Sequence, residues 1–187
     1  LTATSANSNE IIISTLLLFL SGITSIVIAT VLLPIFKKHS IILAFLYLAS
    51  SILGFIAISI DNISVLSMLE LSLEYTKNET GNSDILNTLG SVFYKKHWWT
   101  HYLSLLISCF PVFILYYTLY VSKLIPKVIS IVGIIAVVLM FIEILFSIFG
   151  NSISMNMLLP IGLIQLILPF WLIFKGLNST DLETEMK

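Results

Sequence analysis

The sequence contains no arginine and little charge of either sign. All nine basic residues are lysines, ten residues are acidic, and 10% of the 187 residues are charged, whereas a soluble domain has about 25%. Such a small number of charged side chains cannot cover a water-facing surface. The composition therefore indicates a protein that lies in lipid. The net charge of −1 gives no reason to expect a nucleic-acid partner. Without arginine, the chain also lacks the side chain that usually forms bidentate hydrogen bonds to carboxylate or phosphate groups.

Cysteine is scarce as well. The single cysteine, Cys109, lies inside an apolar run, which excludes an intrachain disulfide and favours a small buried side chain over a reactive thiol. The opening residues LTATSANSNE lack the basic start and apolar middle of a signal peptide. Because the chain also begins without methionine, we expect a processed or truncated start.

Five long apolar runs dominate the rest of the chain. Each is long enough to cross a bilayer as a helix of about 20 residues, and a helix pairs every backbone N–H and C=O group inside hydrocarbon. We therefore expect an all-α, polytopic transmembrane helix bundle that forms a single domain. The expected spans are about residues 11–36, 40–60, 100–122, 128–149 and 155–174, with an outer helical loop at 61–99 and a polar tail at 176–187. Within the loop, Ser83-Asp84 is typical of a helix start.

The lysines predict the orientation of these spans. Lysines 37, 38, 123, 127 and 175 adjoin span ends that share one side when five spans alternate. The positive-inside rule places that side in the cytoplasm, so we expect a bacterial inner-membrane protein with its visible N-terminus outside and its C-terminus cytoplasmic. One further span before Leu1 would explain the outside start and would give six spans in the intact protein.

Short motifs mark the ends of the last three spans. His101 opens one span, SKLIPKVISIVG (Ser122–Gly133) starts the next, and PIGLIQLILPFWLIFKG (Pro160–Gly176) forms the last. In these motifs the chain resembles the bacterial integral-membrane family catalogued as domain of unknown function 4386. The resemblance implies six spans and brings no biochemical activity with it. The family often has glutamate where this chain has Gln165.

Glu143 is the most unusual residue, because VLMFIEILFSIFG places its carboxylate inside the fourth span. A charge on a lipid-facing helix costs at least ~3 kcal/mol, so Glu143 should face protein or water, or be protonated. Either a functional role or a simple hydrogen bond between helices explains such an acid. Asp61, His101 and Gln165 lie at similar depth, so we expect the four to form an outward-facing polar pocket.

The stretch HWWTH (residues 97–101) has two interpretations. Histidines four residues apart can begin a metal site, and His97 and His101 would then need Glu143 or Asp61 as a third ligand. We assign no metal or other cofactor, because the residues between them supply no base. His101 is expected instead to pair with Glu143 and to titrate near neutral pH.

The tryptophans of the same stretch favour the second interpretation. Trp98 and Trp99 stand at a span end beside two lysines, as interfacial anchors do, and Trp171 stands near the end of the last span. Membrane lipids are therefore expected partners of these three side chains.

Three function classes follow. The favoured one is a non-enzymatic membrane protein that binds or carries a small solute, a proton or a lipid through the polar pocket, because no complete catalytic set is present. A membrane-embedded enzyme using His101 and Glu143, with or without a metal, is the first alternative. A structural or accessory membrane subunit is the second. The inner half of the spans lacks polar groups and no inverted repeat is visible, which disfavours a carrier.

Overall fold

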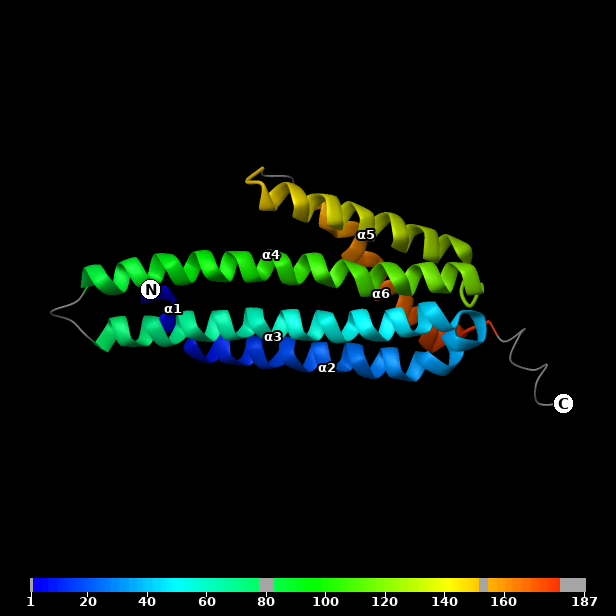
Figure 1. Cartoon of the computed structure of the whole chain (residues 1–187), viewed down its shortest axis with the longest axis horizontal. Coiled ribbons are helices and arrows are strands. Elements are labelled where there is room, and N and C mark those ends of the chain that lie inside the picture. Colours follow the sequence, from blue (N-terminus) through cyan, green and yellow to red (C-terminus); the bar gives the residue numbers. More distant parts are fainter. Residues whose placement is uncertain (1, 78–82, 152–154, 179–187) are drawn as a thin grey trace. The chain divides into compact units, whose positions relative to one another are not determined.

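The computed structural model describes residues 2–77, 83–151 and 155–178, and these residues form helices without any strand among them (Figure 1). The elements are α1 (Thr2–Ala6), α2 (Ser8–His39), α3 (Ile41–Lys77), α4 (Ser83–Ser122), α5 (Lys127–Ile148), the 3-10 helix η1 (Met155–Leu158) and α6 (Leu159–Lys175). Five of the described helices are long and apolar enough to cross a membrane. The all-α polytopic fold is therefore confirmed, and the chain is a multi-pass integral membrane protein.

Two of the helices are much longer than a bilayer requires. α3 has 37 residues and α4 has 40, so each measures about 55–60 Å, against a hydrocarbon core of about 30 Å. α3 runs on through Asp61 and Asn62, where the expected second span ends. α4 starts at Ser83, the residue that the sequence pattern indicates. Residues 78–82, between these two helices, lie outside the described residues.

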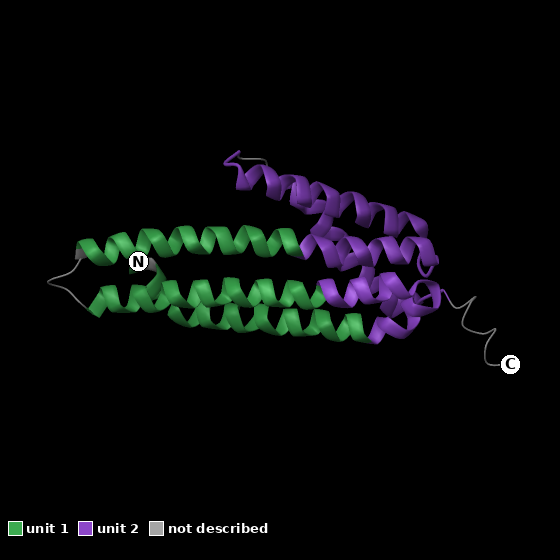
Figure 2. Ribbon diagram, in the orientation of Figure 1, with its two compact units in different colours: residues 1–30, 51–107 green, residues 31–50, 108–187 purple. Residues whose placement is uncertain are grey.

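The described residues fall into two compact units (Figure 2). Unit 1 comprises residues 1–30 and 51–107, which include α1 and parts of α2, α3 and α4. Unit 2 comprises residues 31–50 and 108–187, which include the remaining parts of those three helices together with α5, η1 and α6.

In unit 1, α2 and α3 pack as an antiparallel pair. The rings of Phe19 and Phe55 have their centroids 5.2 Å apart. Further along, Asn62 Nδ2 on α3 donates a hydrogen bond of 3.2 Å to the carbonyl of Thr15 on α2. From the first contact to the second, the residue number decreases on α2 and increases on α3, so the two helices run antiparallel. Gly22 allows this approach, because a Cβ there would lie 2.7 Å from Cδ2 of Phe55.

In unit 2, Tyr116 of α4 joins three helices. Its side chain is fully buried, its ring lies directly against Gly133 of α5, and its hydroxyl donates a 3.2 Å hydrogen bond to the carbonyl of Ile164 on α6. A buried tyrosine hydroxyl needs such a partner. The packing therefore depends on glycine at position 133, since any larger residue would overlap the ring.

This packing predicts that Gly133→Ala destabilises the protein by about 1–3 kcal/mol, the usual cost of overpacking a core. Gly162→Ala is the matched control, because a Cβ on that α6 glycine meets nothing within 4 Å. Thermal unfolding in detergent, followed by tryptophan fluorescence, measures both. Equal melting temperatures for the two variants would contradict the packing role of Gly133.

Candidate functional site

Asp61, buried in α3, accepts three hydrogen bonds from α4. His97 Nδ1 donates to Oδ1 over 3.0 Å, Thr100 Oγ1 donates to the same oxygen over 2.8 Å, and His101 Nδ1 donates to Oδ2 over 3.2 Å. The three donors stand at positions i, i+3 and i+4, so they share one face of the helix. We call these four residues the Asp61 cluster.

The cluster fixes the tautomer of both histidines. An ionised carboxylate only accepts hydrogen bonds, so the proton that each ring shares with Asp61 sits on Nδ1. Nε2 of each ring is therefore not used by the carboxylate. The side chain of His101 is 48% exposed and that of His97 is 27% exposed, so His101 has the better access to solvent. An imidazole oriented in this way can accept a hydrogen bond at Nε2 when neutral and donate one when protonated.

The cluster adjoins an aromatic group on α4. The ring centroid of Trp98 lies 4.8 Å from that of Trp99 and 4.8 Å from that of Tyr102. About 20 Å of α4 precedes His97, so the cluster lies well inside this long helix. A tryptophan pair next to lysines is typical of the membrane–water boundary. The anchoring role of Trp98, Trp99 and Trp171 stays a prediction, and Trp171 is partly buried near the end of α6.

Asn62, the neighbour of Asp61, belongs to the same polar layer and was not expected from the sequence. It is buried, and its amide bonds the Thr15 carbonyl of α2. Consecutive residues of α3 thus attach that helix to α4 and to α2. Thr100 was also missed, although its position three residues after His97 puts it on the same helix face.

The other two residues of the predicted pocket lie in unit 2. Glu143 is buried in α5, and Ser147 Oγ, one turn along the same helix, donates a 2.9 Å hydrogen bond to its Oε1. Gln165 is on the exposed face of α6. His101, which the sequence pattern paired with Glu143, is bonded to Asp61 instead. The convergence of Asp61, His101, Glu143 and Gln165 into one pocket stays a prediction.

Among residues 2–77, 83–151 and 155–178, no three or more His, Cys, Asp or Glu side chains are arranged to hold a metal ion. His97 and His101 share one carboxylate through Nδ1, so in this structure they belong to a hydrogen-bonded cluster.

The buried carboxylate gives a direct test of the cluster. Asp61→Asn replaces one of the two accepting oxygens of the carboxylate with an NH2 group, which cannot accept a hydrogen bond from the surrounding donors. We expect a loss of about 1–3 kcal/mol in the free energy of unfolding, the usual cost of leaving buried donors unpaired. Glu70→Gln, at an exposed acid of the same helix, is the matched control. If Asp61→Asn melted at the same temperature as Glu70→Gln, the cluster would have no part in holding α3 against α4.

The model of the family described as a domain of unknown function (DUF4386) matches residues 1–176, which confirms the resemblance drawn from the motifs. No curated protein and no solved structure matches the chain.

Proposed function

We propose that this chain, which belongs to the DUF4386 family, binds a small anionic solute through the Asp61 cluster. The observation that carries the proposal is that one buried carboxylate holds two imidazoles by Nδ1 and leaves Nε2 of each ring unused by Asp61. When both rings are protonated, these nitrogens become two hydrogen-bond donors four residues apart on one helix face. Two such donors suit an anion such as a carboxylate or phosphate.

The charges on α4 support an anion rather than a cation. Lys95 and Lys96 are exposed on the same helix, immediately before His97. From Ile85 to Ile107, α4 carries no acidic residue. Apart from the Asp61 carboxylate of α3, which both histidines contact, this stretch of α4 presents positive groups and no acid of its own, a charge pattern that attracts negative solutes.

Protonation links this binding to pH. Histidine side chains change charge between about pH 5 and 8, and the carboxylate that contacts both rings is that of Asp61 on α3. The neighbouring contact with α2 is made by Asn62 and Thr15, which are uncharged. The ring centroids of His97 and His101 are 5.7 Å apart, so an anion bound beside them lies close to both rings. It is held more strongly by charged imidazoles than by neutral ones. Anion binding should therefore strengthen as the pH falls.

A second candidate function, general-base catalysis at His101, draws support from the same pair. A carboxylate that orients an imidazole through Nδ1 prepares Nε2 to take a proton. The pH dependence separates the two functions. A base needs the neutral ring and gains as the pH rises, whereas anion binding needs the charged ring and gains as it falls.

Titration with acetate and with inorganic phosphate tests anion binding, with the fluorescence of the neighbouring Trp98 as the signal. The purified protein should respond at about pH 5.5 and lose the response at about pH 8. His101→Gln should abolish the response, and His39→Gln, at an exposed histidine that ends α2, should retain it. Neither anion giving a response at the lower pH, or an undiminished response in His101→Gln, would refute the proposal.

We further propose that the protein lies in a bacterial inner membrane with the α5–α6 connection outside. Lysines at the end of α2, around the α4–α5 connection and at the end of α6 support this orientation. The Asp61 cluster is then near the outer surface, where a solute reaches it from outside the cell.

Cysteine labelling in intact cells tests the orientation. In a Cys109→Ser background, Asn151→Cys should react with a membrane-impermeant maleimide. His39→Cys should react only after the membrane is permeabilised. Both substitutions are at exposed positions, so accessibility within the protein does not decide the result. The reverse labelling pattern would place the Asp61 cluster on the cytoplasmic side.

A further inference from the structure

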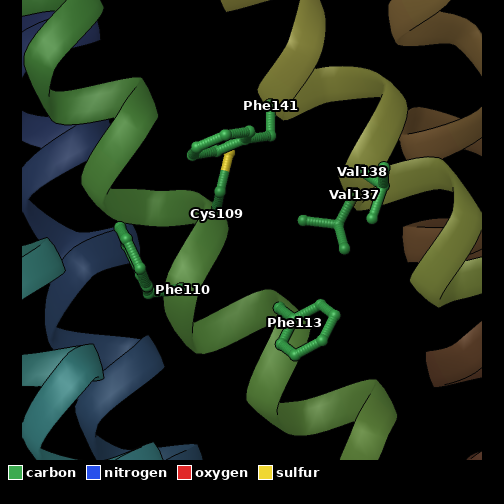
Figure 3. A pocket seen from close by; sticks show the side chains of 6 residues that line it. All are labelled: Cys109, Phe110, Phe113, Val137, Val138 and Phe141. Carbon is green, nitrogen blue, oxygen red and sulfur yellow. The ribbon is translucent and has the colours of Figure 1, made fainter.

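A cavity of about 220 Å³ lies between α4 and α5 within unit 2 (Figure 3). Its lining residues are Cys109, Phe110 and Phe113 of α4, and Val137, Val138 and Phe141 of α5. None of these side chains carries nitrogen or oxygen. In Figure 3 the side chain of Cys109 points toward that of Phe141, and Phe113 and Val137 line the same pocket.

The lining of this cavity offers a water molecule no hydrogen-bond partner among its side chains. A buried water needs two to four polar partners, and an engineered cavity of about 150 Å³ lined by Leu, Ile and Phe stays dry and binds benzene. The present cavity is larger and equally apolar, but it is open on one side, where Phe110, Phe113 and Val138 are exposed. An empty space of this size would forfeit the dispersion contacts of the residues around it, so an apolar occupant is favoured.

The position of the cavity along α5 indicates its depth in the bilayer. α5 starts at Lys127 and ends at Ile148, so Val137 lies about 15 Å from one end and Phe141 about 10 Å from the other. In a hydrocarbon core of about 30 Å, this is the middle of the bilayer. Only acyl chains are abundant at that depth.

The rim of the cavity is part of the lipid-facing surface. Phe110, Phe113 and Val138 are exposed large apolar residues on two helices that cross the membrane. A lipid chain beside these helices can therefore enter the cavity without crossing any polar surface. This continuity favours a chain from the bilayer over a free molecule from water.

We propose that this cavity is a binding site for one acyl chain of a membrane lipid. The phenylalanine rings and the valines form the walls, and the chain fills the space between α4 and α5. Because lipid tails are as apolar as the lining, close packing rather than the hydrophobic effect selects the bound chain. The site is independent of the Asp61 cluster and of its proposed ligand.

Photo-cross-linking tests the site in nanodiscs made with a phospholipid that bears a diazirine in the middle of one acyl chain. In the unchanged protein, peptide mass spectrometry should locate cross-links at Cys109, Phe113 and Phe141. Val138→Trp fills the cavity from its rim and should abolish these cross-links. Val132→Trp is the matched control, because Val132 is 42% exposed on the same helix, as Val138 is at 43%, and does not line the cavity.

The folded state of each variant is checked by its melting temperature, and Val138→Phe replaces Val138→Trp if the larger residue prevents folding. Cross-links spread evenly over the exposed residues of α4, α5 and α6 would overturn the proposal, as would unchanged cross-links at Cys109 and Phe141 in a folded filling variant. A free diazirine-bearing alkane that labels the cavity while the phospholipid does not would overturn the assignment to a lipid chain.

Discussion

A carboxylate buried beside apolar helices must have its hydrogen bonds supplied by the protein. For Asp61 one face of α4 supplies all three. This requirement sets both the rotation and the sliding position of α4 against α3 within unit 1, because a shift of one residue would carry His97 and His101 off the shared face. Asn62 applies the same constraint to α2 through the Thr15 carbonyl. Tyr116 meets the same requirement in unit 2, where its hydroxyl bonds the Ile164 carbonyl.

The sequence predicts the helices through the lengths of its apolar runs, and the described part of the chain contains five helices of the required length and character. Hydropathy does not predict where a helix ends. The apolar run ends at Asp61-Asn62, yet α3 continues to Lys77. The backbone stays helical at these two residues, because their side chains form hydrogen bonds with neighbouring helices and do not compete for the backbone groups of α3. The start of α4 was predictable, because Ser83-Asp84 is a local signal that needs no tertiary contact.

The candidate site was predictable only where it depends on one helix. Spacing alone indicates that His97 and His101 share a face, and the same rule would have added Thr100. Their partner depends on which helices are neighbours, and matched depth in the membrane does not determine that. Glu143 was the expected partner of His101, but its hydrogen-bond donor in the structure is Ser147, four residues along the same helix. The apolar cavity has no sequence signal, because it arises from the side-chain conformations of six residues on two helices.

The two oxygens of Asp61 accept different hydrogen bonds, and this difference determines which histidine is available to a ligand. His97 and Thr100 both bond Oδ1 of Asp61, whereas His101 is the donor to Oδ2. If an anion draws His101 outward, Oδ1 keeps two donors and the carboxylate stays attached to α4. The Thr100 hydroxyl does not titrate in the physiological range, so this attachment persists at any charge of the rings. His101 is also the more exposed of the pair. One carboxylate can therefore hold two helices together through His97 and Thr100 and still present His101 to a solute.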